Sequence, residues 1–388
     1  MKTVITAARL LTPDKSIDHP VLVIEDEWIV ALGAREQLAI PAGARHHDFP
    51  NEILAPGFID IHIHGGSGHD VMELSASSLA AIESGMVKHG VTSYLPTTVT
   101  APLPDTLRSL EHLGKAVTVK SEPGRSRPLG IHLEGPFISH AKRGVHPPEN
   151  LLQPSPKVLR QFYEASGGAV RMITIAPEIE GGVETIAEAA KLGIHISLGH
   201  SNATFAESNA GIEAGARHAT HTFNAMRPLD HREPGILGAI LSDDRVTADI
   251  IADGLHVDPA VITVFLRAKG IERTILITDA ISATGMPDGK YKLGGFEVEV
   301  KGNRCDLDGK LAGSVLTLDR AVRNVMQFVP LPLEDAVRLV TLNPARLLCL
   351  ADPRGTLTVG QMADIVVLTP SSEVVTTMAA GQFAQLRS

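Results

Sequence analysis

The chain has 388 residues, a formal net charge of −9 and 44% hydrophobic residues, which is enough apolar material for one large domain and a smaller one. Its charges are spread out, without the runs of Lys and Arg that bind nucleic acid or an anionic membrane, so we expect neither partner. The two cysteines, Cys305 and Cys349, lie far apart, which argues against a disulfide framework and favours a cytoplasmic protein. No apolar stretch reaches the length of a membrane span.

Strand-like segments dominate the first 54 residues. Apolar and β-branched residues fill segments 20–25 and 28–32, and Asp26-Glu27 joins them in a way that is typical of a β-hairpin. We therefore expect this end of the chain to form strands rather than helices.

From about residue 55 to 345, short runs rich in Val, Ile and Thr alternate with helix-like stretches, which is the pattern of repeated βα units. Helix-like segments 75–89, 182–192 and 259–269 each end near a glycine that can terminate a helix. Eight strands favour an α/β fold of the (β/α)₈ barrel type, because an open dinucleotide-binding sheet would need a glycine fingerprint after its first strand. The expected strands are 57–65, 92–98, 129–137, 171–178, 195–201, 218–225, 247–254 and 274–280.

After the eighth strand, segment 291–311 carries the turn signals Gly294-Gly295, Gly302-Asn303 and Asp308-Gly309, which predict a hairpin. Short strand-like segments then return at 356–359, 363–368 and 373–379. We expect residues 1–54 and 346–388 to combine into one small β-sandwich domain beside a barrel domain of residues 55–345.

Histidines and carboxylates recur where the expected barrel strands end. His62 and His64 are two residues apart on the first strand, so their side chains point to the same face. Such a pair alone is equally compatible with an ordinary polar face. Barrel active sites, however, lie at the carboxyl ends of the strands. The residues that we expect to converge there are His62, His64, Glu134, His200, His221 and Asp279.

Neutral imidazoles and carboxylates, without cysteine ligands, suit a hydrolytic zinc, iron(II) or manganese site. A cation of this kind lowers the pKa of a bound water to about 7, and we expect the resulting hydroxide to be the nucleophile. Asp279 can take a proton from that water as general base and return it to a leaving amine as general acid. The sequence therefore predicts a metal-dependent amide hydrolase.

Longer motifs resemble the amidohydrolase superfamily and, within it, the N-acetylglucosamine-6-phosphate deacetylase family, over essentially the whole chain. Residues 55–60 (APGFID) followed by the two histidines are shared by many amidohydrolases, whereas the combination of HLEGPF at 132–137, GHSNA at 199–203, FNAM at 223–226 and ADGLHVD at 252–258 is specific to the deacetylases. The resemblance implies hydrolysis of N-acetyl-D-glucosamine 6-phosphate to D-glucosamine 6-phosphate and acetate, in amino sugar metabolism.

The resemblance also assigns roles to single residues. Glu134, His200 and His221 match the common metal ligands, Asp279 matches the catalytic acid and base, and His146 matches a group that polarises the acetyl carbonyl. The implied substrate contacts are Val145, His146, Asn224, Ala225, Arg232, His256, Leu311, Ala312 and Gly313.

Members of the family differ in whether they use one metal or two. Because the first strand here carries His62 and His64, we expect that two divalent ions can bind, with Glu134 bridging them. Zinc or iron(II) is the first expectation, and manganese or cobalt is the alternative.

Arg232 suits a sugar phosphate because a guanidinium can donate two parallel hydrogen bonds at any relevant pH, and His256 could add charge. A solvated loop arginine is the alternative. In similar enzymes part of the phosphate contact comes from a neighbouring subunit, so the resemblance implies a homodimer. We interpret Lys142 and Arg143 as a solvated charge cluster rather than phosphate ligands.

Two other functions stay open. One is deacetylation of another N-acetylhexosamine phosphate, such as the galactosamine epimer. The other is a non-catalytic scaffold on the same fold, although such proteins usually lose metal ligands and none is missing here. A ring-opening hydrolase is disfavoured, because its bridging lysine has no counterpart on segment 171–178.

Overall fold

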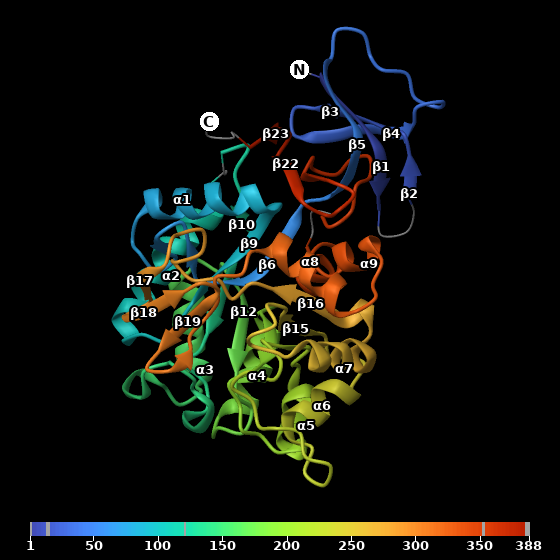
Figure 1. Cartoon of the computed structure of the whole chain (residues 1–388). Coiled ribbons are helices and arrows are strands. Elements are labelled where there is room, and N and C mark those ends of the chain that lie inside the picture. The colour runs from blue at the N-terminus through green and yellow to red at the C-terminus, as the bar shows by residue number, and fades with distance from the viewer. Residues whose placement is uncertain (1, 13–15, 120–121, 351–353, 385–388) are drawn as a thin grey trace.

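The computed structural model describes residues 2–12, 16–119, 122–350 and 354–384. A large α/β body contains the middle of the chain, and a smaller group of strands lies at one end of it, close to both termini (Figure 1). Among the described residues, no helix is both long and apolar enough to cross a membrane.

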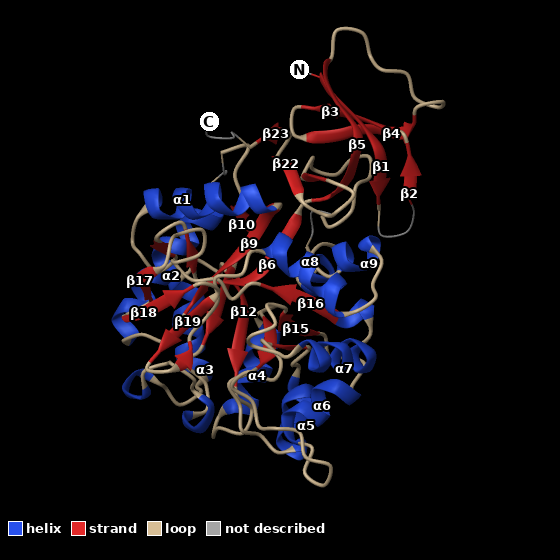
Figure 2. Ribbon diagram, in the orientation of Figure 1, coloured by secondary structure: helices blue, strands red, loops and turns tan. Residues whose placement is uncertain are grey.

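The centre of the large body is a group of parallel strands with helices around it (Figure 2), and eight of these strands form a ring. Six of them pair in the order β6, β9, β11, β12, β13 and β14, and β15 pairs with β16. Backbone hydrogen bonds from Thr222 N to Asp249 O and from Asp279 N to His62 O, both 2.9 Å, join these two groups and close the ring. The strands are β6 (Phe58–Ile63), β9 (Val91–Thr98), β11 (Ile131–Glu134), β12 (Val170–Ile175), β13 (His195–Leu198), β14 (His218–Ala219), β15 (Ala248–Ile251) and β16 (Thr274–Ile277).

A strand lies in each of the eight expected segments, but seven of these strands end earlier than expected, and only His218–Ala219 of segment 218–225 is strand. The three expected helices are present as α1, α4 and α7. Each of these helices is followed within four residues by a glycine with positive φ, namely Gly90, Gly193 and Gly270, as the sequence indicated. The helices are α1 (Ala76–Met86), α2 (Leu103–Thr118), α3 (Pro156–Ala165), α4 (Gly182–Lys191), α5 (Phe205–Ala214), α6 (Gly235–Ser242), α7 (Pro259–Lys269), α8 (Leu318–Phe328), α9 (Leu333–Arg338) and α10 (Leu342–Leu347).

The helices bury an apolar stripe against the strands. In α8 the buried side chains include Leu318, Ala321, Val322 and Val325, which are spaced so that they share one helix face. These side chains join one continuous core that also contains the outward side chains of the barrel strands. The packing of helices on the sheet therefore fixes where the carboxyl ends of the strands lie.

Strands from both ends of the chain form a second sheet, in the order β23-β22-β21-β5-β1-β3-β4, with β2 paired to β1. The expected hairpin is confirmed as β3 and β4, and β21 runs antiparallel to β5. The sandwich form and the boundaries at 54 and 346 stay predictions, and β5 runs two residues past the first of them. The strands are β1 (Lys2–Leu11), β2 (Ser16–Asp18), β3 (Pro20–Glu25), β4 (Trp28–Ala34), β5 (Arg45–Pro56), β21 (Ile365–Leu368), β22 (Val374–Ala379) and β23 (Gln382–Phe383).

The expected strand at 356–359 is wrong, because this segment is a loop. The Gln361 side chain replaces a neighbouring strand as its partner: Oε1 accepts hydrogen bonds from Thr356 Oγ1 at 2.8 Å and from Thr358 N at 3.0 Å. Leu357 is fully buried, which explains the strand-like apolar signal.

Segment 291–311 forms more than the expected hairpin. It belongs to a four-stranded antiparallel sheet that leaves the barrel after β16. Its strands are β17 (Gly289–Leu293), β18 (Phe296–Lys301), β19 (Arg304–Leu307) and β20 (Lys310–Leu311). The remaining short strands are β7 (Gly65–Gly66) and β8 (His69–Asp70), which pair with each other, and β10 (Arg127–Pro128), which pairs with β9. The 3₁₀ turns are Val87–His89, His140–Lys142, Pro148–Asn150 and Ile271–Arg273.

Candidate metal centre

The six residues expected at the strand ends lie together at the carboxyl end of the barrel. Among the described residues, two groups of possible metal ligands form there: His62, His64 and Asp279 make one, and Glu134, His200 and His221 make the other. Within each group the ligand atoms lie within 4.8 Å of one another, and all six side chains are buried. The structure therefore brings the expected residues to one place.

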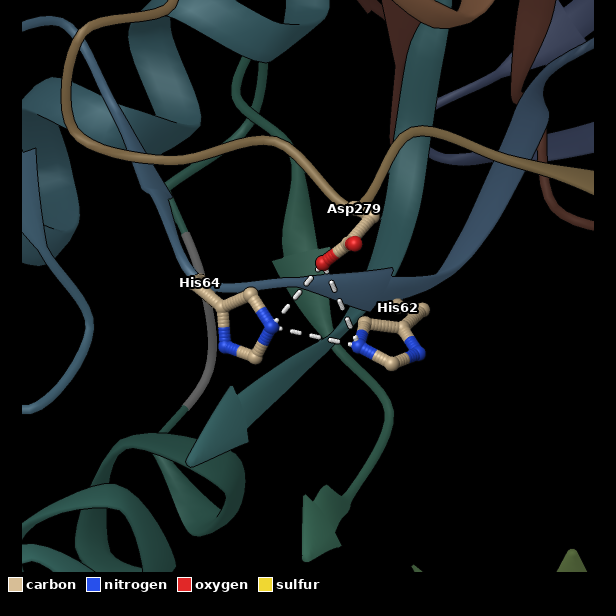
Figure 3. Close-up of side chains that lie close together, drawn as sticks. All are labelled: His62, His64 and Asp279. Atoms are coloured by element: carbon tan, nitrogen blue, oxygen red, sulfur yellow. Dashed lines mark hydrogen bonds and ion pairs between the residues drawn. The ribbon is translucent and has the colours of Figure 1, made fainter. Parts of the chain in front are cut away.

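The first group spans the seam between β6 and β16. His62 lies in β6 and His64 directly after it, and Asp279 reaches both from the loop that follows β16 (Figure 3). The two Nε2 atoms of the histidines are 3.2 Å apart, and Asp279 Oδ1 is 3.0 Å from His64 Nε2 and 3.5 Å from His62 Nε2. This geometry suits three ligands around one cation.

The second group is centred on the Glu134 carboxylate at the end of β11. Its Oε1 is 3.1 Å from His200 Nε2 and 2.9 Å from His221 Nε2, and the two histidine nitrogens are 3.1 Å apart. The other oxygen, Oε2, is 3.2 Å from His64 Nε2. Glu134 therefore faces both groups with different oxygens, as a bridging carboxylate would.

Three of the six residues hold a left-handed backbone. His200, His221 and Asp279 have φ of 47°, 30° and 51°, and each lies two residues beyond the end of its strand. Left-handed conformations are unfavourable for residues with a Cβ atom and cluster at functional sites. The chain therefore turns sharply at three strand ends, and the turn aims these side chains at the centre of the ring.

Hydrogen bonds behind the ligands orient two of the histidines. His64 Nδ1 is 2.9 Å from the Thr97 carbonyl oxygen, and His200 Nδ1 is 2.8 Å from the Lys142 carbonyl oxygen. A carbonyl accepts only, so each Nδ1 carries the proton and each Nε2 keeps its lone pair for a metal. The backbone N–H of His221 donates to the buried Asp249 carboxylate.

The electrostatics of the cluster favour ionised carboxylates. Burial alone would raise the pKa of Glu134, but the surrounding His62, His146, His200 and His221 hold it well below its usual range. Burial is likewise outweighed at Asp279, where His64 and His62 lower the pKa to about 2. Two buried negative charges are therefore retained, and such charges need cationic partners.

The donor set fits a divalent cation. Imidazole nitrogens and carboxylate oxygens are ligands of zinc, iron(II), manganese and cobalt. Two pairs of imidazole nitrogens face each other at 3.1–3.2 Å, and a cation between them would bind both lone pairs. The buried Nδ1 atoms of His62 and His221 have no hydrogen-bond partner in the described part of the chain. The chain thus offers ligands for a divalent cation, and zinc, iron(II), manganese and cobalt all suit them.

A cavity of about 350 Å³ opens directly above the cluster. Besides the ligands it is lined by eight of the nine expected substrate contacts, which come from four separate segments: Val145, His146, Asn224, Ala225, His256, Leu311, Ala312 and Gly313. His146 lies against the ligands, with Nε2 3.6 Å from Glu134 Oε2.

The ninth expected contact, Arg232, lies outside this cavity. Its side chain is exposed in the loop between β14 and α6, and its backbone N–H donates to Asp230 Oδ1 at 2.8 Å. Within one copy of the chain, Arg232 therefore does not reach the metal centre. Its assignment to the phosphate stays a prediction.

Comparison with known proteins identifies this arrangement. Residues 53–384 match the Amidohydrolase family. The chain belongs to the amidohydrolase family. The resemblance that the motifs indicated is confirmed.

Among amidohydrolases the chain is similar to deacetylases of amino sugar phosphates. The N-acetylgalactosamine-6-phosphate deacetylase of Escherichia coli O157:H7 is 37% identical over 385 residues, 99% of this chain and 100% of that protein. The N-acetylglucosamine-6-phosphate deacetylase of Homo sapiens is 39% identical over 349 residues, 86% of this chain and 84% of that protein. The first relative is named for the galactosamine epimer and the second for the glucosamine epimer.

One solved structure of an amidohydrolase is close in shape. It is an Asp-to-Ala variant of N-acetyl-D-glucosamine-6-phosphate deacetylase from Mycobacterium smegmatis, in complex with N-acetyl-D-glucosamine-6-phosphate. Its TM-score is 0.92 at 36% identity, with coverage of 99% of this chain and 100% of that one.

Sequence reasoning missed several residues of the amidohydrolase site. Leu293, Phe296 and Lys310 from the β17–β20 sheet line the cavity, although the sequence indicated only a hairpin there. Thr100 was also missed: its Oγ1 lies 2.8 Å from His146 Nδ1 and orients that ring. Lys142 and Arg143, which we interpreted as solvated, line the cavity as well. No sequence signal placed these segments over the barrel mouth, since their position depends on how they fold back over the barrel.

Proposed function

We propose that the chain hydrolyses the acetamido group of an N-acetylhexosamine 6-phosphate, with N-acetyl-D-glucosamine 6-phosphate as the first candidate substrate. The products are D-glucosamine 6-phosphate and acetate. The observation that carries the proposal is the position of Asp279, a buried carboxylate that touches a ring of metal ligands at the floor of a sugar-sized cavity. The similarity to deacetylases of this substrate class supports it.

Glu134, His200 and His221 would hold the essential divalent ion, and His62 and His64 would hold a second one with Glu134 and Asp279. A cation at this place supplies Lewis acidity, which lowers the pKa of water and polarises an amide carbonyl. Zinc or iron(II) is the first candidate, and manganese or cobalt the alternative.

Asp279 is the proton carrier in this proposal. Its pKa of about 2 keeps it ionised before the reaction, so it can accept a proton from the attacking water. The water oxygen bonds to the acetyl carbon, and the C–N bond then breaks as Asp279 returns the proton to the departing nitrogen. One water is consumed, and an amine and acetate are formed.

His146 would orient and polarise the substrate. Its Nδ1 lies 2.8 Å from Thr100 Oγ1, which leaves Nε2 facing Glu134 and the cavity. A donor at this place stabilises negative charge that develops on the acetyl oxygen. The backbone of Leu311, Ala312 and Gly313, together with Asn224 and His256, would then bind the sugar and its phosphate.

The decisive experiment measures acetate release from N-acetyl-D-glucosamine 6-phosphate. We expect turnover by the purified chain, its loss after treatment with a chelator, and its return on addition of zinc, iron(II), manganese or cobalt. Absence of acetate release with all four ions would contradict the proposal and favour a non-catalytic scaffold.

The epimer N-acetyl-D-galactosamine 6-phosphate is a second candidate substrate. It is a candidate because the E. coli relative named for that epimer is 37% identical over nearly the whole chain, close to the 39% of the human relative named for the first candidate. The ratio of kcat/KM for the two epimers decides between them. A higher value for the galactosamine epimer would replace the first candidate and leave the chemistry unchanged.

We further propose that the active form is a homodimer in which Arg232 of each chain binds the phosphate in the partner's site. The exposure of Arg232 outside its own cavity supports this assignment. A guanidinium is suited to a phosphate because it donates parallel hydrogen bonds. Sedimentation or light scattering of the purified chain measures the oligomeric state.

A further inference from the structure

The catalytic role proposed for Asp279 depends on an unusual backbone. Its φ of 51° is left-handed, and it lies two residues past the last residue of β16, where its own backbone N–H donates to the carbonyl oxygen of His62 at 2.9 Å. Left-handed backbone costs free energy at a residue with a Cβ atom, so other contacts must hold it.

One buried residue from a different segment holds both peptide groups that flank Asp279. Ser314 Oγ donates to the carbonyl oxygen of Thr278 at 2.5 Å, and Ser314 N donates to the carbonyl oxygen of Asp279 at 2.8 Å. A third bond runs from Ile281 N to Ser314 O, 3.0 Å. The side chain of Ser314 is 2% exposed, so water does not compete for these bonds.

The two flanking peptide groups define the conformation of Asp279. Rotation about φ moves the peptide group on its N-terminal side, and rotation about ψ moves the one on its C-terminal side. Ser314 bonds the first through its hydroxyl and the second through its backbone. It can therefore fix both angles, which decide where the Asp279 carboxylate points.

We propose that Ser314 is a positioning residue for the reaction, whose hydroxyl fixes the backbone of Asp279 so that the carboxylate reaches the metal ligands and the substrate. This inference rests on the function proposed above for Asp279. Ser314 itself does not line the cavity.

The same segment carries part of the substrate cavity. Leu311, Ala312 and Gly313 line it and lead directly into Ser314. Gly313 has φ of 62°, and a Cβ atom there would lie 2.4 Å from Ile281 Cγ2 and 3.2 Å from the carbonyl oxygen of Asp279. The backbone of this segment thus packs closely against the Asp279 loop. Replacing the Ser314 hydroxyl leaves this backbone contact in place.

The test is Ser314→Ala, with Ser166→Ala as the matched control. Ser166 is also 2% exposed, and its Oγ donates to a backbone carbonyl, that of Tyr163, at 2.7 Å and accepts from Ala169 N at 3.1 Å. Ser314 Oγ has a similar pattern, since it accepts from Leu316 N at 3.0 Å, whereas Ser166 Oγ accepts one further bond, from Val170 N at 3.3 Å. Both variants lose similar hydrogen bonds, but only one of them lies beside Asp279.

We expect kcat of Ser314→Ala to fall about tenfold, the effect of one net hydrogen bond, with KM within about twofold of wild type. Ser166→Ala should keep both constants. Equal kcat values for the two variants would overturn the inference. Should Ser314→Ala fail to fold, Ser314→Cys keeps the size but has only a weak donor, and its kcat should fall in the same direction.

A second readout does not depend on activity. In crystal structures of wild type and Ser314→Ala, we expect the Asp279 carboxylate to leave its position or to occupy more than one conformer in the variant. An unchanged Asp279 would overturn the inference. If instead wild type releases no acetate while Asp279 moves in the variant, the proposed function fails and the structural coupling stands.

Discussion

Asp279 combines two properties that its side chain alone does not provide. Its carboxylate is ionised although it is buried, because neighbouring imidazoles lower its pKa to about 2. Its backbone is left-handed, which turns the side chain toward His64 instead of along the strand. The first property suits a proton acceptor, and the second places that acceptor beside the metal ligands.

A first prediction at this scale concerns Asp279→Asn. Asparagine tolerates a left-handed backbone and keeps the size of the side chain, but it cannot carry a proton, so we expect a native fold and kcat reduced by about 10²-fold or more. Steady-state kinetics with the sugar phosphate and circular dichroism measure both. Asp308→Asn is the matched control, because Asp308 is exposed and also left-handed, with φ of 50°. Wild-type kcat in Asp279→Asn would refute the assigned role.

A second prediction separates the two groups of ligands. His64 belongs with His62 and Asp279, whereas His200 belongs with Glu134 and His221. We expect His64→Gln to reduce bound metal from two ions per chain to one, and His200→Gln to remove the ion on which activity depends. Elemental analysis after reconstitution with zinc measures the stoichiometry. A single ion in wild type after reconstitution would show that the first group holds no metal of its own.

At the scale of elements, the contact between α1 and β9 buries an ionisable group outside the active site. Tyr94 of β9 is fully buried and its OH donates to Glu83 Oε1 of α1 at 3.2 Å. Burial raises the pKa of Glu83 from 4.5 to about 7, more than the Tyr94 hydrogen bond lowers it. In the folded chain Glu83 therefore keeps its proton at a pH where the unfolded chain has lost it.

The sign of the resulting pH dependence follows from this difference. Burial penalises only the ionised form of the Glu83 carboxyl group. This contribution to stability is therefore fully present below pH 4.5, where the group is protonated in both states, and is lost as the pH rises to about 7. We expect the free energy of unfolding to fall by about 3 kcal/mol across that window, at about 1.4 kcal/mol per pH unit. Glu83→Gln should remove the fall. Urea unfolding at several pH values measures it, with the exposed Glu111→Gln as control. The same fall in both variants would refute the assignment to Glu83.

The elements differ in how far their sequence predicts them. The barrel strands were predictable, since buried parallel strands are continuous runs of β-branched residues, and α7 was expected at its observed bounds, Pro259–Lys269. The segment at 356–359 was not, because one glutamine side chain supplies the hydrogen bonds that a neighbouring strand would give. Local sequence patterns do not reveal such a partner.

The features of the candidate site likewise differ in how far the sequence predicts them. Its six ligands were predictable because each lies in or just after a recognisable strand, but the left-handed turns at His200 and His221 were not, since neither position is a glycine. The cover of the cavity by Phe296 and Lys310 was not predictable either, because it depends on how the β17–β20 sheet folds back over the barrel. Tertiary packing, rather than local preference, decides these features.

At the scale of the whole molecule, the exposed position of Arg232 makes the homodimer testable through function. If Arg232 completes the partner's site, Arg232→Gln and Asp279→Asn damage different halves of each site. A mixed dimer then has one site with both residues intact and one site with neither. Two inactive variants should therefore restore activity when their subunits exchange, which a site built within one chain cannot do.

We expect equal amounts of the two variants, unfolded together and refolded, to reach about a quarter of wild-type activity, because about half of the dimers are mixed and each has one intact site. Acetate release after refolding measures this, and each variant refolded alone gives the baseline. Pairing Asp279→Asn with Glu134→Gln is the control, because both residues lie in the same site of the same chain and their mixture should stay at the baseline. An Arg232 mixture that also stays at the baseline would refute the shared site. The phosphate contact would then come from groups that line the cavity within one chain, such as His256, Lys142, Arg143 or Lys310.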